Sequence, residues 1–219
     1  MNITHAVTEN IVGDKLEAIF KRQKELMDKY HDIEKRGGLL QTEDCPVNLD
    51  DKRGQARIKD FAWRVTEEIG EALDALNVHD DIVHFQEELI DGLHFLTELT
   101  ILAGVTPKDL QENCSVDEGK DILDGMFEVL TNPVDTAVWS LEARVAVFIE
   151  KLGMTCNCLK NKPWKQSNMV TDKKAFKENL STAWHAYIIL LAYNMDADEV
   201  ADIYLKKSQV NKFRQRSNY

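Results

Sequence analysis

The chain is short of glycine and proline, with 10 Gly and 4 Pro among its 219 residues. Average usage is about 7% glycine and about 5% proline, so roughly half of the expected chain breakers are present. This shortage argues against a sheet protein with many tight turns and favours long helices. The 43% hydrophobic content excludes a disordered chain. We therefore predict an all-α protein.

Basic residues and cysteines are also few. Lysine and arginine total 27 against 38 acids, which gives a net charge of -11 and no overall attraction to nucleic acid or to an anionic membrane. The four cysteines follow no zinc or disulfide spacing. The most apolar stretch, 183–195, contains His185, Tyr187 and Tyr193 and is too short to cross a bilayer. We expect a cytoplasmic protein with no membrane contact and no stable nucleic-acid binding.

Helical spacing of apolar residues, interrupted by caps and breakers, divides the chain into helices and two loops. The predicted loops are 39–54, long enough for a lid or binding segment, and 161–171. The predicted helices cover 8–36, 56–76, 80–103, 107–113, 118–130, 133–160, 172–195 and 197–216. This pattern predicts one all-α domain over residues 1–219.

A weak internal repeat appears when the chain is shifted by 90 positions. Residues 88–110 then fall on 178–200 without a gap, through a long helix, its cap and the next helix. Helical periodicity alone can produce such a match, and a duplicated helical unit is the more specific interpretation. In that interpretation copy one, about 56–113, carries the acids, and copy two, about 134–216, is degenerate and carries a basic helix.

Two pairs of acids lie on consecutive predicted helices. Glu68 and Glu71 are three residues apart, as are Glu88 and Asp91, so each pair projects from one helical face. If the helices pack antiparallel, four carboxylates converge into a site for Mg²⁺ or Mn²⁺. The alternative is a solvated acidic surface. Glu67 and Asp74 flank the same face as candidates to support the ligands or to act as the base.

The last predicted helix carries a basic stripe. Lys207, Asn211 and Arg214 lie at positions i, i+4 and i+7, and their ammonium, amide and guanidinium groups suit phosphate oxygens. The alternative is an ordinary basic helix end that offsets the helix dipole. A metal site together with a phosphate site is what cleavage of a phosphoanhydride requires.

These motifs resemble a known group of enzymes. The two acid pairs resemble those of the all-α nucleoside triphosphate pyrophosphohydrolases, which include dimeric dUTPases, phage dCTPase/dUTPases and MazG-like enzymes. The basic stripe, followed by Gln215 and Tyr219, is similar to the phosphate-binding ending of the first two groups. The segment from Gln23 to Asp28 resembles the one with which dimeric dUTPases contact uracil. Those enzymes also resemble an internally duplicated MazG unit.

The resemblance implies a MazG-like helical bundle, a homodimer and a role for each motif. Mg²⁺ would be bound by Glu68, Glu71, Glu88 and Asp91. Glu71, with Glu68, would orient or deprotonate the attacking water, and Lys207, Asn211 and Arg214 would hold phosphates. The implied reaction converts dUTP or dCTP to the monophosphate and pyrophosphate and so controls a pyrimidine deoxynucleotide pool. A phage origin is also implied.

The identity of the base stays open, because Met27 stands where the dUTPases have a base-reading asparagine. A thioether cannot replace an amide, so either another group reads uracil or the base is cytosine or a modified pyrimidine, with a purine less favoured. Gln23 and Met27 are the candidate base contacts, together with Trp63, which would stack on the base unless it is a core residue. His94 either orients Asp91 or is a core histidine.

Three other functions were weighed. One is a MazG-like pyrophosphohydrolase of other or broad specificity, and another is a non-catalytic helical interaction module. The third is a di-iron protein, suggested by Asp81-x-x-His84 and Asp91-x-x-His94. Both of those pairs fall on one predicted helix, whereas a di-iron bundle takes them from two.

Overall fold

A computed structural model describes residues 3–131 and 138–217 of the chain. Within these residues it contains eight α-helices, one short 3₁₀ turn and no strand, which confirms the predicted all-α class. The elements are η1 (Ile3–His5), α1 (Lys15–Gly37), α2 (Lys52–Asn77), α3 (Ile82–Leu102), α4 (Pro107–Cys114), α5 (Ile122–Thr131), α7 (Leu141–Asn157), α8 (Lys173–Leu191) and α9 (Ala197–Arg216).

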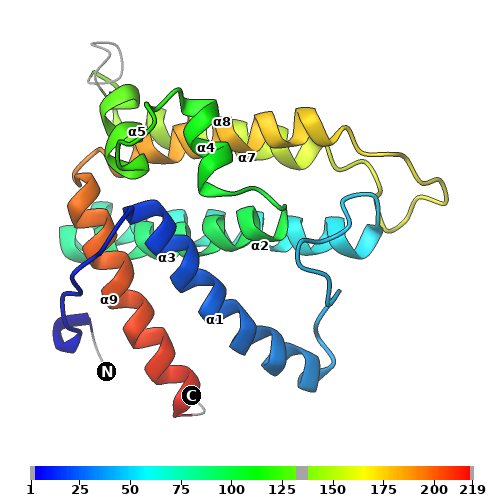
Figure 1. Cartoon of the computed structure of the whole chain (residues 1–219), viewed down its shortest axis with the longest axis horizontal. Helices are drawn as coiled ribbons and strands as arrows, with labels where there is room; N and C mark the ends of the chain where they lie inside the picture. The colour runs from blue at the N-terminus through cyan, green and yellow to red at the C-terminus, as the bar shows by residue number, and fades with distance from the viewer. Residues whose placement is uncertain (1–2, 132–137, 218–219) are drawn as a thin grey trace.

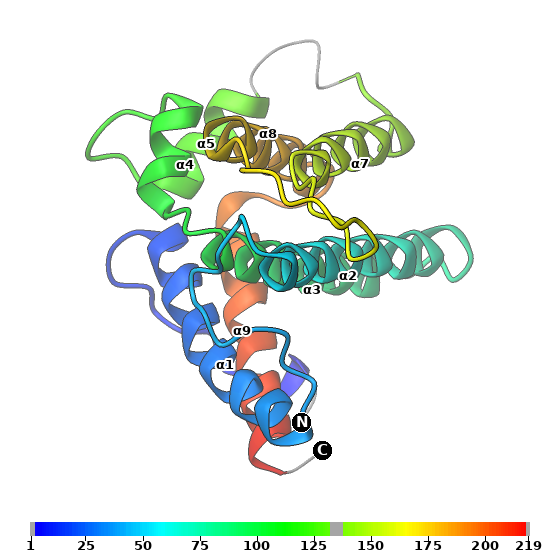
Figure 2. The same ribbon diagram turned by 90° about the vertical axis from the view of Figure 1, so that its right-hand side faces the viewer.

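The helices form three tiers (Figure 1). The hairpin of α2 and α3 lies in the middle, and the hairpin of α7 and α8 covers one side of it, with α4 and α5 at one end. On the other side α1 and α9 run down from α2 and α3 in both views (Figure 2), and both helices contact α3. The first and last long helices of the chain are therefore neighbours on the face of α3 opposite to α8.

Capping residues explain where several helices begin. Asp51 accepts hydrogen bonds from the backbone of Arg53 and Gly54, so α2 starts at Lys52, inside the predicted 39–54 loop. Our start of the first helix at residue 8 is wrong. Gly13 has φ of 100° and Asp14 accepts from the backbone N–H of Glu17 at 2.9 Å, which delays the start to Lys15.

The predicted helix over 133–160 also begins later than expected. Ser140 caps α7 by accepting from the backbone N–H of Ala143, and the helix starts at Leu141. Residues 132–137, which include the predicted start, lie outside the described part of the chain, as does Tyr219.

The packing of α8 against α3 fixes the central helix. The Trp184 indole donates to Thr100 Oγ1 at 2.7 Å and the Tyr187 hydroxyl donates to the carbonyl of Leu89 at 2.6 Å, both in the buried interior. Gly92 allows this approach, because a Cβ atom there would overlap the Tyr187 hydroxyl. Helix α3 is thus held on one side while its other side faces α1 and α9.

The predicted 39–54 loop is attached to the 161–171 loop near its C-terminal end, at residues 49 and 50. Asn161 Nδ2 donates to the carbonyl of Asp50 at 2.9 Å, and the Thr171 hydroxyl and Gln55 Nε2 both donate to the carbonyl of Leu49, at 2.6 and 2.8 Å. The bonds from Asn161 and Thr171 tie residues 49 and 50 to the 161–171 segment, and the bond from Gln55 ties Leu49 to α2. The part of the loop nearest α2 is therefore not free to act as a lid.

The internal duplication has a structural parallel. A shift of 90 residues places the α2–α3 hairpin on the α7–α8 hairpin, and it places Thr106, the cap of α4, on Asp196, the cap of α9. Both caps form reciprocal capping boxes with the third helical residue. The duplication stays a prediction, and the expected start of copy two near 134 lies outside the described ranges.

No single helix of the described chain is long and apolar enough to span a membrane, although α3 and α4 together pass that test as a pair bent by 100°.

Candidate active site

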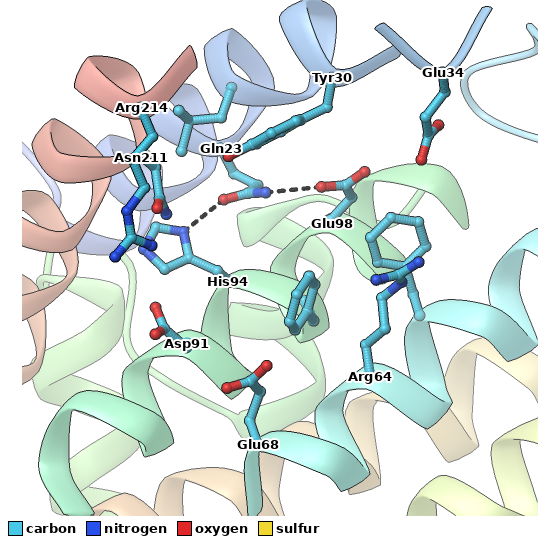
Figure 3. Close-up of a pocket in the computed structure, with 13 residues that line it drawn as sticks. Gln23, Tyr30, Glu34, Arg64, Glu68, Asp91, His94, Glu98, Asn211 and Arg214 are labelled. Carbon is cyan, nitrogen blue, oxygen red and sulfur yellow. Dashed lines mark hydrogen bonds between the residues drawn. The ribbon is translucent and has the colours of Figure 1, made fainter. Parts of the chain in front are cut away.

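A cavity of about 350 Å³ lies among α1, α2, α3 and α9 (Figure 3), a size within the range of small-molecule sites. Glu68 and Asp91 lie at one end of it and Glu34 and Glu98 toward the other, with the hydrogen-bonded Gln23 between His94 and Glu98 (Figure 3). Its polar lining is supplied by Gln23, Tyr30 and Glu34 of α1, Arg64 and Glu68 of α2, Asp91, His94 and Glu98 of α3, and Asn211 and Arg214 of α9. The four helices that meet in space thus come from both ends of the chain.

Three of the four predicted metal ligands meet at one end of the cavity. Glu68 and Glu71 from α2 and Glu88 from α3 each offer a carboxylate oxygen, and these atoms all lie within 4.8 Å of one another. Burial, together with the neighbouring carboxyl groups of Glu88 and Asp91, raises the pKa of Glu68 to about 8. Such a cluster calls for a positive counter-charge, and its hard oxygen donors fit a divalent cation such as Mg²⁺.

Asp91, the fourth predicted ligand, is paired with a lysine. Its Oδ2 atom lies 2.6 Å from Lys207 Nζ, which also lies 3.4 Å from Glu87 Oε2. Burial raises the pKa of Asp91 to about 6, although Lys207 opposes the shift. Lys207 therefore links the basic helix α9 directly to the acidic face of α3.

The other two members of the basic stripe line the same cavity. Asn211 and Arg214 extend from α9 on the side where Asp91 and His94 lie (Figure 3). The predicted spacing thus places all three residues of the stripe beside the acids, with Lys207 nearest to them. Their role in binding phosphates stays a prediction.

A buried hydrogen-bond network beside His94 is organised around Gln23 (Figure 3). Its Oε1 atom accepts hydrogen bonds from His94 Nδ1 at 2.8 Å and from the Tyr204 hydroxyl at 2.7 Å, while its Nε2 atom donates to Glu98 Oε2 at 2.9 Å. Burial lowers the pKa of His94 to about 3, so the ring is neutral and its one N–H is on Nδ1. His94 therefore supports Gln23 and is not hydrogen-bonded to Asp91.

The helical stripe that faces the cavity explains why Met27 is absent from it. On α1 the lining positions are 23, 26, 30 and 34, a spacing of three and four residues. Met27 lies beside this stripe and is buried in the core, with 2% of its surface exposed. Its predicted contact with the base has no geometric support.

Three further predicted residues lie away from the cavity. Trp63 is 63% exposed, and its indole N–H donates to Glu67 Oε1 at 2.8 Å. Asp74 Oδ2 lies 3.3 Å from His79 Nε2. None of the three lines the cavity, so their predicted parts in base binding or in supporting the metal ligands also lack geometric support.

The sequence analysis missed the residues around Glu98. Arg57 is almost fully buried and forms an ion pair with Glu34 at 2.7 Å, with Glu98 Oε1 at 3.8 Å. The rings of Phe61 and Phe95, with centroids 6.1 Å apart, line the cavity beside these charges. One signal was available, because Glu98 is the single acid in the otherwise uncharged segment 92–107.

Comparison with known proteins gives one match. A family model described as dUTPase matches residues 15–219 of the chain. No curated protein and no solved structure matches it. The matched segment contains all four helices that form the cavity.

Proposed function

The chain belongs to the dUTPase family and is a nucleotide pyrophosphohydrolase, and from this premise we propose a more specific reaction. The protein hydrolyses a pyrimidine deoxynucleoside triphosphate, dUTP or dCTP, to the monophosphate and pyrophosphate in the presence of Mg²⁺. The supporting observation is one cavity that is lined by Glu68 and Asp91, by Asn211 and Arg214, and by Gln23 and Glu98. These groups suit the metal, the phosphates and the base of one nucleotide.

The carboxylates of Glu68, Glu71, Glu88 and Asp91 would hold Mg²⁺, and Mn²⁺ can substitute because it accepts the same oxygen ligands. When bound, the ion neutralises phosphate charge and makes a coordinated water more acidic. Glu71 is the exposed member of the cluster. In our proposal its carboxylate orients the attacking water and accepts its proton, and Glu68 assists from the half-buried side.

The cations of α9 would hold the phosphates. Lys207 already lies between Asp91 and Glu87, at the boundary between the acids and the rest of α9. An incoming phosphate would give the Lys207 ammonium a third anionic partner there. Asn211 and Arg214 would bind the other phosphate oxygens and stabilise the charge of the departing pyrophosphate.

We also propose a homodimer and a role in controlling a pyrimidine deoxynucleotide pool, both supported by membership of the family. Exposed apolar side chains of α2, α3 and the turn between them, including Trp63, Val78 and Val83, could supply contacts outside the cavity. Light scattering coupled to gel filtration tests the dimer, which a single monomer-sized peak would exclude. A cytoplasmic location and a phage origin stay predictions.

The reaction is tested by incubating dUTP, dCTP, dTTP, dATP and dGTP with the protein, with and without Mg²⁺, and separating pyrophosphate from single phosphate. We expect metal-dependent pyrophosphate release from a pyrimidine nucleotide, and Glu71→Gln should lower kcat by about 100-fold or more. Glu67→Gln is the matched control, because Glu67 lies on the same helix but outside the carboxylate cluster. Full turnover without metal, or in Glu71→Gln, would overturn the mechanism.

A further inference from the structure

Glu98 is a buried acid that the proposed hydrolysis does not use. It is 4% exposed, lines the cavity, and lies on α3 two helical turns beyond Asp91, so about 10 Å separates their positions along the helix axis. If the phosphates lie at Asp91, the base of the same nucleotide reaches toward Glu98. Burial of a carboxyl group is costly unless hydrogen bonds or opposite charges compensate it. The partners of Glu98 therefore show whether it has capacity left for a ligand.

The surroundings of Glu98 compensate it only in part. Gln23 donates one hydrogen bond to Oε2 at 2.9 Å, whereas Oε1 lies 3.8 Å from Arg57 and 3.9 Å from His31 Nε2, both beyond hydrogen-bond distance. A carboxylate has about four acceptor positions. The charged and titratable groups near it are Tyr30, His31 and Glu34 of α1, Cys45 of the loop before α2, Arg57 and Arg64 of α2, and Tyr204 of α9.

Gln23 has little capacity left for a ligand. Its oxygen already accepts from His94 and Tyr204, and one of its two amide hydrogens is used by Glu98. It can offer one further N–H, and Met27 is outside the cavity. The Glu98 carboxylate is therefore the main acceptor at this end, beside the aromatic rings of Phe61 and Phe95, on which a base can stack.

We propose that Glu98 reads the base by accepting a hydrogen bond from the 4-amino group of cytosine, so that the pocket favours dCTP over dUTP. An ionised carboxylate only accepts hydrogen bonds, and the amino group of cytosine is its natural partner. Uracil has a carbonyl oxygen at the same position, which would place two acceptors against each other. This inference rests on the proposed nucleotide hydrolysis and adds the residue that selects the base.

The test compares kcat/KM for dCTP and dUTP at about pH 8.5, in wild type and in Glu98→Gln. We expect wild type to favour dCTP by about tenfold, the usual scale of one buried hydrogen bond. An amide can donate to the carbonyl of uracil as well as accept from cytosine, so the preference should fall toward onefold in the variant. Glu34→Gln removes another carboxylate from the same cavity and should keep the wild-type ratio.

A substrate analogue tests the same point without changing the protein. A triphosphate whose pyrimidine carries hydrogen at C4 lacks both the amino donor and the carbonyl acceptor, so wild type should rank dCTP first, this analogue second and dUTP third. Hydrolysis of both natural nucleotides with no dCTP preference, or with the same preference in a folded Glu98→Gln variant, overturns the role of Glu98 and leaves the hydrolase intact. No hydrolysis of either nucleotide overturns both proposals.

Discussion

Replacing Glu98 with glutamine should flatten the pH dependence of stability. Burial raises the pKa of this carboxyl from its usual 4.5 to about 7 in the folded protein, against the hydrogen bond from Gln23 and the charge of Arg57. Folding therefore favours the protonated form. The sign follows from linkage: the stability that Glu98 contributes is fully present at low pH and is lost as the pH rises from 4.5 through the folded-state value of about 7.

The size of the effect follows from the two pKa values. The difference of 7 − 4.5, or about 2.5 units, corresponds to a total of about 3 kcal/mol at 1.36 kcal/mol per unit. Between about pH 5.5 and about pH 8 the unfolded group is already mostly ionised while the folded group ionises, and integration over this interval gives a loss of about 2 kcal/mol. Glu98→Gln removes this contribution and retains the shape of the side chain.

The assay is urea denaturation of both proteins at several pH values, followed by circular dichroism, with equal m-values as the check on two-state behaviour. Glu68 and Asp91 also have raised pKa values, but they are common to both proteins and cancel in the difference. We expect the unfolding free energy of wild type to fall by about 2 kcal/mol more than that of the variant across this interval. Parallel curves would refute the assignment of a buried, titrating Glu98.

Three further substitutions test other contacts. Lys207→Met should tighten Mn²⁺ binding by the nucleotide-free protein, because Lys207 competes for Asp91 at 2.6 Å; calorimetry that shows equal or weaker binding would contradict this. Gly92→Ala should lower the unfolding free energy by about 1–3 kcal/mol through overpacking against Tyr187, and thermal denaturation at the wild-type midpoint would argue against the close approach. Arg57→Met should cost about 3 kcal/mol near pH 8, because it leaves the buried Glu98 and the half-buried Glu34 without their cation; an unchanged urea midpoint would count against that pairing.

Local rules predicted the features that depend on short sequence distances. The i, i+3 spacing of Glu68 and Glu71 places both on one helical face because 3.6 residues complete a turn. The helices predicted to begin at residues 107 and 197 do begin there, after caps at Thr106 and Asp196. The start of the first helix is harder to predict from local rules. Apolar spacing continues back to residue 8, but the conformation of Gly13 and the cap at Asp14 override it.

Contacts between distant segments could not be derived from spacing. Nothing local indicates that Lys207 pairs with Asp91, 116 positions earlier, because the crossing of α9 over α3 sets that contact. The resemblance suggested Gln23 and Met27 as base contacts; Gln23 lines the cavity, whereas the rotation of α1 directs Met27 into the core. Met27 lies four positions after Gln23, and whether it also faces the cavity depends on how α1 packs against the other helices. That packing is a property of the whole fold.

The order of the four cavity helices along the chain has a consequence for synthesis of the protein. The Tyr204 hydroxyl of α9 bonds to Gln23 of α1, a separation of 181 residues, and Lys207 reaches α3 from the same late helix. While the ribosome is still adding α7 and α8, the acids and Gln23 already exist, but the wall that carries Asn211 and Arg214 does not. A nascent chain would therefore be unable to enclose a nucleotide until α9 had been made, so the site is completed only after the segments that carry its acids have long been synthesised.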